Sequence, residues 1–565
     1  MMIDSLPPFL IFFAGALLVA LAPGRLRPIL TLMVPIFGGW NLWYIADGGG
    51  GLQVALFDTQ LELVRSDKLS LLFGILFHLA TFLACLYAFH LKDRMQQVAA
   101  LIYAGGALGA VFAGDLITLF VAWEIMAVSS VYLIWARRTP RASAAGLRYL
   151  TMQISSGLLL LAGALLHISE TGSPAFGPMG LSSLAGILIF TAFGIKCAFP
   201  LVHSWLTDAY PEATPTGMVF LSAFTTKVAV YGLARGYAGT EVLIYIGTAM
   251  AMFPIFFAVI ENDLRRVLAF SLINQVGFMV VGIGIGSQLA MNGAISHAFN
   301  DVLFKGLLLM SMGAVLHQTG KINGSELGGL YKSMPITTGL CIVGAASISA
   351  FPLFSGFVSK SMVMVAVADE GHWVVWLLLL FASAGVFHHA GIKIPYFAFF
   401  AHDSGIRTRE PPLNMLLAMG LSALLCIGIG VFPSVLYGLL PWDVDYAPYT
   451  ADHVLTQLQL LFFSALAFAW LNLAKLYPPE LPSVNLDADW LYRRLGLGAA
   501  RRGERLWIKA EQGSARLAAH GSGLLQRAAA RHYGPASVLA RTWSTGFAAL
   551  WIVVLLGICL ILYYL

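Results

Sequence analysis

The chain has 565 residues, of which 59% are hydrophobic and 11% are charged, and its formal net charge is +5. Because a soluble domain carries about 25% charged residues, this composition excludes an ordinary soluble domain, which would expose large apolar patches. The sequence therefore predicts a polytopic membrane protein.

Roughly fifteen or sixteen apolar runs are long enough to cross a bilayer, which takes about 20 residues. They predict an all-α protein with about 14 core transmembrane helices and a further helix at the C-terminal end. The first run has no basic flank and no small-residue cleavage site, so we expect it to be retained rather than removed as a signal peptide. The runs span residues 8–23, 28–46, 67–90, 96–113, 115–136, 144–168, 181–201, 217–237, 241–260, 267–286, 290–317, 336–366, 373–401, 413–437, 453–477 and 544–565.

Lys and Arg residues gather in the loops that follow odd-numbered runs, and basic loops of membrane proteins face the cytoplasm. We therefore expect the N-terminus outside and the basic loops inside a bacterial inner membrane. These residues are Arg25, Arg27, Lys92, Arg94, Arg137, Arg138, Arg141, Arg148, Arg265 and Arg266.

Residues 486–541 form a region of different composition, with ten Lys or Arg residues and four acidic ones. Apolar residues are interleaved with the basic ones, so this region is predicted to be an amphipathic segment at the cytoplasmic membrane surface. A solvated basic linker is the alternative. Its glycines, at 496, 498, 503, 513, 521 and 523, argue against one continuous helix. The run at 544–565 would then return the chain to the outside.

Neither the cysteines nor the loops predict a cofactor. The cysteines form no CxxC pair, which argues against disulfides and iron–sulfur clusters. They are Cys85, Cys197, Cys341, Cys426 and Cys559. The sequence has no Gly-rich phosphate loop, dinucleotide fingerprint or HExxH motif. We therefore expect no nucleotide, redox or metal cofactor, and no role with nucleic acid.

Ionisable side chains inside the apolar runs are the candidate functional residues. A charge at the bilayer centre costs several kcal/mol, so each one is a functional hypothesis. Burial disfavours the protonated form of a lysine, and a nearby carboxylate favours that form again. A buried lysine can therefore exchange protons, whereas arginine stays protonated. The candidates are Glu124, Lys196, Lys227, His297, Lys305, Lys360 and Lys393.

Purely structural interpretations compete with these proton-transfer roles. Lys227 and Lys393 could be lysines at helix ends that reach toward the membrane surface, and His297 could be a packing residue. The adjacent His388 and His389 cannot share a helix face, so we interpret them as mostly structural. Asp115 and Asp301 are ambiguous, Asp115 because it lies near the boundary of a run.

The tetrapeptide AFPL occurs twice, at residues 198–201 and 350–353, and each copy has a lysine close by. Proline interrupts helical hydrogen bonding, which a membrane helix tolerates where the break faces protein or water. Lys196 and Lys227 accompany the first copy, and Lys360 and Lys393 the second at similar spacing. Paired breaks are typical of inverted-repeat transporters. We expect segments 1–95 (helices one to three), 96–237 (first repeat, helices four to eight), 241–401 (second repeat, helices nine to thirteen), 413–477 (C-terminal core helices), 486–541 (basic surface segment) and 544–565 (final helix), with broken seventh and twelfth helices.

Three motifs carry a resemblance to a known superfamily. They are HSWLTDAYPEATPTG after the first break, the Trp123–Glu124 pair in an earlier run, and ENDLRRVLAFSLINQVGFM in a later one. Over roughly residues 60–440 the chain resembles the antiporter-like membrane subunits shared by multisubunit Mrp-type sodium/proton antiporters and respiratory NADH–quinone oxidoreductase. It is most similar to the D subunit of the Mrp-type antiporters.

The resemblance implies a role for most of the candidates. Glu124 would pair with Lys196 as a gate, and Lys227, His297 and Lys305 would pass protons along mid-membrane toward an exit at Lys360. Lys393 has no firm family role. The motif that reads Leu264–Arg265–Arg266 departs from the family, in which lysine often precedes the arginine.

The implied function is a proton-translocating subunit of a Na+/proton antiporter, working with other membrane subunits in the lipid bilayer. The basic tail and extra final run are unusual for a D subunit and are similar to the largest antiporter-like subunit of the quinone oxidoreductase. Alternatives are therefore a pump subunit of a redox-driven complex and the membrane partner of a soluble ion- or bicarbonate-handling protein. A scaffold with idle charges and an integral-membrane enzyme are weaker alternatives.

Overall fold

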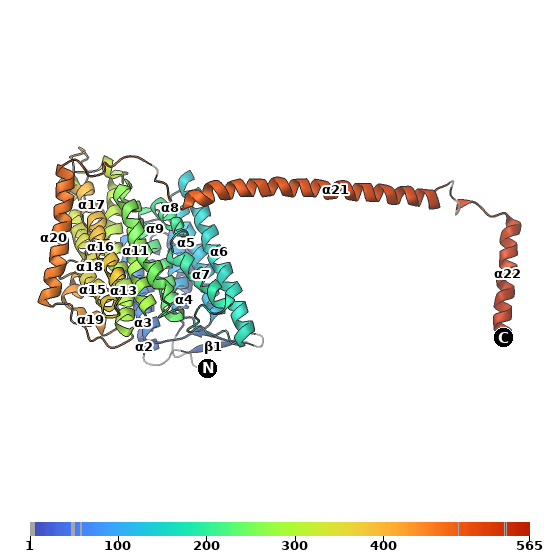
Figure 1. Ribbon diagram of the computed structural model, residues 1–565, viewed down its shortest axis with the longest axis horizontal. Coiled ribbons are helices and arrows are strands. Elements are labelled where there is room, and N and C mark those ends of the chain that lie inside the picture. Colours follow the sequence, from blue (N-terminus) through green and yellow to red (C-terminus); the bar gives the residue numbers. More distant parts are fainter. Residues whose placement is uncertain (1–5, 47–50, 57–58, 484, 536, 538–539) are drawn as a thin grey trace. The chain divides into compact units, whose positions relative to one another are not determined.

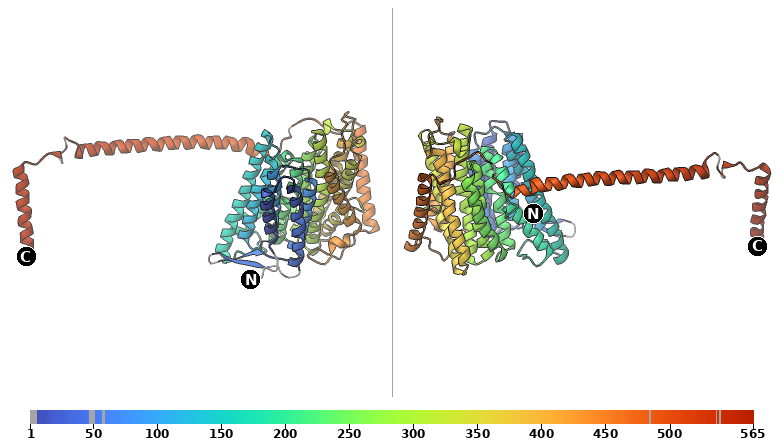
Figure 2. Two further views of the ribbon diagram at one scale, coloured as in Figure 1. Left: turned by 180° about the vertical axis from the view of Figure 1, so that it is seen from behind. Right: turned by 45° about the horizontal axis from the view of Figure 1, so that its top comes forward.

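A computed structural model describes residues 6–46, 51–56, 59–483, 485–535, 537 and 540–565. The chain forms two compact units, Met1–Asp489 and Trp490–Leu565. The described residues form helices apart from one hairpin of β1 (Leu52–Leu56) and β2 (Thr59–Val64) and the connecting loops. In the first unit the helices stand side by side, with α20 at one edge and α6 at the other (Figures 1 and 2).

The predicted runs coincide with the observed helices. Thirteen described helices are long and apolar enough to span a membrane, and three shorter apolar helices fall on the remaining predicted runs. The first unit contains α1 (Pro8–Leu21), α2 (Arg27–Ala46), α3 (Lys68–Tyr87), α4 (Arg94–Phe112), α5 (Leu116–Trp135), α6 (Pro140–Thr171), α7 (Leu184–Cys197), α8 (Ser204–Ala209), α9 (Pro215–Ala223), α10 (Thr225–Gly236), α11 (Val242–Ile260), α12 (Leu264–Ile285), α13 (Gln288–Thr319), α14 (Pro335–Ile348), α15 (Ser355–Asp369), α16 (Trp373–Val386), α17 (Lys393–Pro395), α18 (Leu413–Val431), α19 (Pro433–Tyr437) and α20 (Ala451–Leu473).

Both copies of AFPL break their helices with the same backbone geometry. Ala198 and Leu201 adopt φ +63° and +72°, and Ala350 and Leu353 adopt φ +58° and +75°. At each break the amide of the Phe donates to a carbonyl five residues earlier, at 3.0 Å, which closes the helix end. The predicted broken seventh and twelfth helices are thus confirmed.

Two further helices are irregular beside a lysine. The helix of residues 215–236 is interrupted at Phe224, with φ −110° and ψ −62°, just before Lys227. The helix of residues 373–400 changes to π-helical turns at η4 (Phe387–Ile392) and η5 (Tyr396–Phe400), on either side of Lys393. Pro395 lies between the π turns and has no amide hydrogen to continue the helix.

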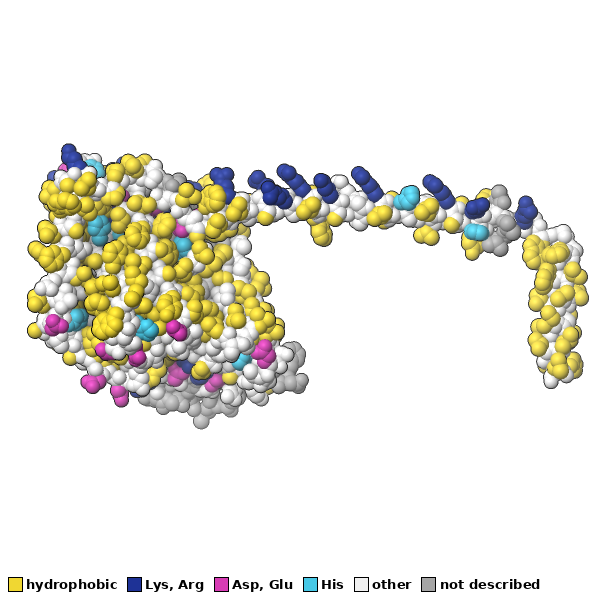
Figure 3. Space-filling model, in the orientation of Figure 1, with side chains coloured by type: hydrophobic (Ala, Val, Ile, Leu, Met, Phe, Trp, Pro, Cys, Tyr) yellow, Lys and Arg dark blue, Asp and Glu magenta, His cyan; other side chains and the backbone are white. Residues whose placement is uncertain are grey.

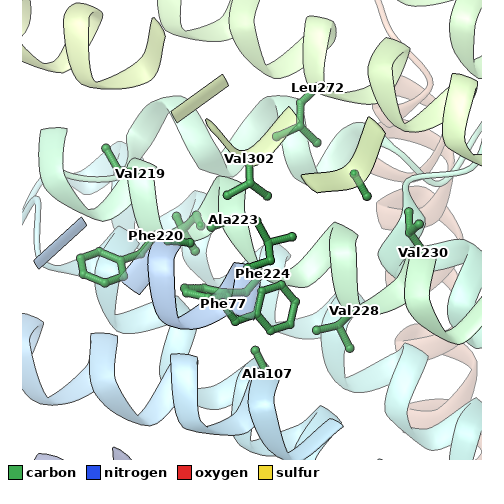
Figure 4. Packing of buried hydrophobic residues seen from close by; sticks show 14 of the residues in the cluster. Phe77, Ala107, Val219, Phe220, Ala223, Phe224, Val228, Val230, Leu272 and Val302 are labelled. Atoms are coloured by element: carbon green, nitrogen blue, oxygen red, sulfur yellow. The ribbon is translucent and has the colours of Figure 1, made fainter. Parts of the chain in front are cut away.

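Apolar side chains from several helices meet around the break at Phe224, as Figure 4 shows. The Phe224 ring packs edge-on against Phe77 of α3 and Tyr103 of α4, with centroid distances of 5.3 and 5.1 Å. Edge-to-face rings contribute about 0.5–1.5 kcal/mol each beyond the area they bury. The break is therefore fixed by tight packing on its apolar side.

The second unit contains η6 (Leu491–Gly496), α21 (Leu497–Tyr533) and α22 (Thr545–Tyr564). The expectation that its glycines prevent one continuous helix is wrong, because α21 runs for 37 residues. Each helical glycine costs about 1 kcal/mol relative to alanine, and the intervening Ala, Arg, Leu, Glu and Gln residues are strong helix formers. Basic side chains gather along one side of α21 and apolar ones along the opposite side (Figure 3). The predicted amphipathic character is therefore present.

Candidate functional site

The predicted intramembrane lysines lie in the interior of the first unit. Lys196, Lys227, Lys305 and Lys393 are 0% exposed and Lys360 is 2% exposed. Because such charges are tolerated only with partners, the groups that surround each ammonium define the site.

Lys196 and Glu124 do not form the expected ion pair in this structure. The Lys196 ammonium donates to the Trp123 carbonyl at 2.8 Å and lies 4.2 Å from the centre of the Trp123 ring. Glu124 is the next residue of α5, and its Oε1 is buried without a hydrogen-bond partner among the described residues. The lysine is thus held by the backbone of the helix that carries the acid, rather than by the acid itself.

The Glu124 carboxylate is accommodated by a glycine in α6. A Cβ atom on Gly157 would lie 1.6 Å from Glu124 Oε1, far closer than two non-bonded atoms can approach. One turn away, both polar atoms of Gln153 are buried without a hydrogen-bond partner among the described residues. Gln153 had no role in the sequence prediction, because a lone glutamine in a long helix resembles a surface residue.

Lys227 has a buried acidic partner, which the sequence left ambiguous. Its ammonium lies 2.5 Å from Asp301 Oδ2, and both side chains are 0% exposed. A second, longer hydrogen bond joins Lys227 to the Ser222 carbonyl at 3.4 Å. Asp301 lies four residues after His297 and four before Lys305, so these three side chains form one stripe of α13. That spacing was the signal in the sequence for Asp301.

His297 and Lys305 continue this stripe through polar contacts to α12 and α15. His297 contacts Ser359 Oγ at 3.1 Å through Nδ1 and Gln275 Oε1 at 3.0 Å through Nε2. Lys305 donates to Ser271 Oγ at 2.7 Å. Because hydroxyl and amide groups can both donate and accept, His297 sits in a polar chain and is not a purely apolar packing residue.

Lys360 lies beside the second break and lines a cavity. Its ammonium donates to the Ile348 carbonyl at 3.0 Å, the last carbonyl of α14. The cavity, of about 410 Å³, continues from Lys360 between α15, α16 and the beginning of α20. Its polar lining includes Asp369, Asp452 and His453. A cavity of this size with polar groups in its wall can hold water molecules.

Lys393 lies where α11 ends, apart from that cavity. Its ammonium donates to the Val259 carbonyl at 2.6 Å and the Glu261 carbonyl at 2.7 Å, and pairs with Glu480 Oε1 at 2.8 Å. Burial raises the pKa of the Glu480 carboxyl, against the opposing charge of Lys393. The sequence could not predict this pair, since 87 residues of irregular spacing separate its members.

Glu480 belongs to the segment that follows α20, described over residues 474–483 and 485–489. Within the first unit this segment makes two further contacts: the Asn485 amide donates to Glu261 Oε2 at 3.3 Å, and Asp487 lies 3.0 Å from His203 Nε2. It therefore connects the end of α20 to the loop after the first break.

Arg265 fixes the loop of the first sequence motif. Its guanidinium is buried and donates to the carbonyls of Pro211, Ala213 and Thr214 at 3.0–3.1 Å. All three carbonyls belong to the stretch HSWLTDAYPEATPTG. The arginine at this position, where the family often has lysine, thus fixes the loop through its hydrogen bonds. Because a guanidinium stays protonated, Arg265 does not exchange protons.

Within the described residues, no group of three or more His, Cys, Asp or Glu side chains is placed to hold a metal ion.

Known proteins similar to this chain share its architecture. The family model described as "NADH:quinone oxidoreductase/Mrp antiporter, TM" matches residues 113–386. NADH-quinone oxidoreductase subunit N of Desulforudis audaxviator (strain MP104C) is 30% identical over 381 residues, which are 60% of this chain and 76% of that protein. The Na(+)/H(+) antiporter A subunit of Alkalihalophilus pseudofirmus is 29% identical over 428 residues, 66% of this chain. The chain spans about half, 52%, of the length of that antiporter protein.

Solved structures show the same fold. A chain of the Mrp complex from Dietzia sp. DQ12-45-1b superimposes with a TM-score of 0.71 at 22% identity, covering 78% of this chain and 96% of that one. A chain of the membrane-bound sulfane sulfur reductase, an archaeal respiratory membrane complex, gives 0.70 at 22% identity and covers 98% and 99%. From its helices, its breaks and these relatives, the chain belongs to the NADH:quinone oxidoreductase/Mrp antiporter family of multi-pass membrane proteins.

Proposed function

We propose that this chain is the proton-translocating subunit of a multisubunit cation/proton antiporter, with Na+ as the cation. One observation carries the proposal. The buried stripe of His297, Asp301 and Lys305 links Lys227 on one side to the Ser359–Lys360 region on the other through hydrogen-bonding groups. Idle charges at this depth would be costly, so a row of them favours transport over a scaffold.

In the proposed path a proton moves between groups that can each bind and release it. Lys227 holds the proton against Asp301, and a shift of that pair would pass it toward Lys305 and His297. Lys360 would receive it and release it into the cavity lined by Asp369, Asp452 and His453. Lysine and histidine suit these steps because both can lose their proton, unlike arginine.

The Glu124–Lys196 pair would act as the gate of the path. In the structure Lys196 is bonded to the Trp123 carbonyl and the Glu124 carboxylate lies against Gly157. Closing the pair would require the carboxylate to leave that space. Breaking a buried pair costs about 3–5 kcal/mol, which movement of two charges through about 100 mV, at 2.3 kcal/mol per charge, would supply.

Orientation, repeats and subunit type belong to the same proposal. The N-terminal end of α1 would face outside and the loop with Arg265 and Arg266 the cytoplasm. Acidic side chains gather at the end with the β1–β2 hairpin on the face shown in Figure 3, which fits this orientation. Residues 96–237 and 241–401 would be the two inverted repeats. The subunit type would be that of an Mrp D subunit, beside other membrane subunits.

A redox-driven pump subunit is the second candidate function. It is favoured by the relative named subunit N of an NADH-quinone oxidoreductase, which is 30% identical to this chain. The same lysines would then be driven by electron transfer in neighbouring subunits instead of by an ion gradient.

The test is to purify the chain from its native membranes in mild detergent and identify the co-purifying proteins by mass spectrometry. Small hydrophobic proteins with a second antiporter-like subunit support the antiporter, whereas iron–sulfur or flavin subunits support the redox pump. Proton release from acidified everted vesicles after addition of Na+ is then measured for the native complex and for Lys227→Ala and Lys360→Ala. Unchanged release in both variants would remove the proposed path.

A further inference from the structure

The proposed path from Lys227 to Lys360 needs a connection to water at the end of the bundle where α11 meets α12. We infer that His389, on the π-helical turn η4, is a proton-transfer residue that connects Lys305 to the Lys393–Glu480 pair at that end. The inference rests on the proposed function, and it gives a role to a histidine that the sequence led us to interpret as structural.

The surroundings of the His389 ring point to this role. His389 is 0% exposed. One ring nitrogen faces the Gly385 carbonyl of the preceding turn, but neither nitrogen reaches hydrogen-bonding geometry with any described residue. Buried polar atoms in native proteins are almost always hydrogen-bonded, to protein or to ordered water. An imidazole that protein groups leave unpaired on both sides is therefore suited to pass protons through water.

The backbone at His389 has the form that proteins use at functional positions. Residues Phe387–Ile392 are π-helical, and π turns in long helices occur frequently at functional sites. The wider turn brings Gly391 against α14, where a Cβ atom would lie 2.3 Å from Ser349 Oγ. Glycine at 391 therefore allows η4 to approach the second break closely.

The two lysines that His389 would connect both act on its ring by their charge. They are Lys305 of α13 and Lys393 of its own helix, and the neighbouring His388 acts on the ring as well. Lys393 follows His389 by four residues, about one turn. Beyond Lys393 lies Glu480, in the extended segment after α20. The order of transfer in this inference is therefore Glu480, Lys393, His389 and Lys305.

The adjacent His388 is placed differently and provides a matched control. Its ring stacks on Tyr477 at 5.4 Å between centroids and meets Phe468 edge-on at 5.3 Å. It thus packs among aromatic side chains of α20 and the segment that follows.

The transfer balances without any other reactant. The Lys393 ammonium gives one proton to an unprotonated nitrogen of the neutral His389 ring, directly or across one water molecule. The resulting imidazolium releases the proton on its other nitrogen to the neutral amine of Lys305. A hydronium ion from the bulk water then restores the proton on Lys393 at the Glu480 carboxylate, so one proton has moved inward. The ring has changed tautomer and returns to its first tautomer before the next transfer.

Arg265, at the same end of the bundle, does not provide this connection. Its guanidinium donates to three backbone carbonyls and, unlike the ammonium of a lysine, cannot be deprotonated in a protein. Lys393 and His389, in contrast, can both exchange protons.

The first experiment compares His389→Gln with His388→Gln in the full complex in everted vesicles. Glutamine retains hydrogen bonding but cannot carry the proton. We expect His389→Gln to slow Na+-driven proton release by about a hundredfold or more, with a larger solvent deuterium isotope effect than in the native complex. His388→Gln should stay within about twofold of the native rate. Proton release at the native rate and an unchanged isotope effect in His389→Gln would overturn the inference.

A second measurement does not depend on transport or on the identity of the driving ion. Nitrogen-15 NMR of histidine-labelled protein in lipid, with the His389 resonances assigned by their loss in His389→Gln, reports ring protonation. We expect exchange between tautomers that Lys393→Gln suppresses. A single fixed tautomer, the same with and without Lys393, would overturn the inference even if His389→Gln fails to assemble. Absence of Na+-driven proton release in the native complex would instead count against the proposed antiporter, and the NMR result would still decide the role of His389.

Discussion

The Lys227–Asp301 pair lies at the middle of the proposed path, and its geometry allows a quantitative prediction. The charges are 2.5 Å apart and both side chains are 0% exposed. At an effective dielectric constant of about 20, their attraction is roughly 6–7 kcal/mol. Burying two ions costs several kcal/mol each, so the pair contributes little net stability while each partner depends strongly on the other.

We therefore expect Asp301→Leu and Lys227→Met to be more damaging singly than together. Each single change leaves one buried charge uncompensated and should destabilise the fold by about 3–5 kcal/mol. The double variant replaces the pair by apolar side chains and should recover more than half of the lost stability. Proton transport should be absent in all three variants, because none retains the central donor and acceptor.

Thermal unfolding in detergent, followed with a thiol-reactive fluorescent dye, measures this effect. Cys85, Cys197, Cys341 and Cys426 are buried in the first unit, so the dye reports its opening, while the exposed Cys559 gives a constant background. If the double variant is destabilised by the sum of the two single effects, the charges are not coupled and the reasoning is refuted. Transport by Asp301→Asn at the native rate would separately exclude Asp301 from the path.

Three further predictions test other parts of the first unit. Gly157→Ala should displace the Glu124 carboxylate, which lies against this glycine, and reduce proton transport at least about tenfold. Gly306→Ala is the control and should be tolerated, because its Cβ would meet nothing within 4 Å. Equal transport by the two variants would contradict the close fit at Gly157. Thr456 lines the same cavity as Lys360. In Thr456→Cys the thiol should react with a membrane-impermeant thiol reagent added on the side of the membrane where α20 begins. Lack of reaction would mean that the cavity is closed to water. Arg235, at the end of α10, donates to both carboxylate oxygens of Asp67 at 2.9 and 2.7 Å. Burial raises the pKa of the Asp67 carboxyl, but Arg235, the Ser70 amide and Arg65 together outweigh burial and lower this pKa. The bond between Asp67 and Arg235 should therefore persist at neutral pH and be lost as the pH falls below the ordinary value of 3.8. Below that pH, amide hydrogen exchange at the start of α3 should become faster, by an amount that corresponds to a loss of about 1 kcal/mol or less in the local opening free energy. Unchanged protection of these amides at acidic pH would contradict the prediction.

The helices and the breaks could be predicted because their causes are local. Twenty consecutive apolar residues have few alternatives to a membrane span, and proline at 200 and 352 removes a backbone donor wherever the chain folds. The resemblance to the family then predicted roles for most of the buried charges. None of these inferences requires knowledge of which helices are neighbours.

The partners of the lysines could not be predicted, because they depend on packing between distant segments. Asp301 reaches Lys227 across 74 residues and Glu480 reaches Lys393 across 87. Lys196 takes a backbone carbonyl in place of Glu124, and every sequence offers hundreds of carbonyls. The continuity of α21 was missed for a different reason, since isolated glycines lower helix stability without ending a helix.

The two breaks share a backbone geometry but hold their lysines differently, and this difference favours distinct roles in the proposed mechanism. At each break two residues other than glycine adopt positive φ, a conformation that costs about 1 kcal/mol or more per residue. Such strain persists only where the surrounding structure maintains it. Lys360 is bound to the carbonyl that its own break leaves unpaired, that of Ile348, and it opens onto the polar cavity. Lys196 is bound instead to the backbone of α5, one residue before Glu124. Movement at the first break would therefore act on the helix that carries the acid, whereas movement at the second would act on access to water, which is the division between gate and exit that a directional path requires.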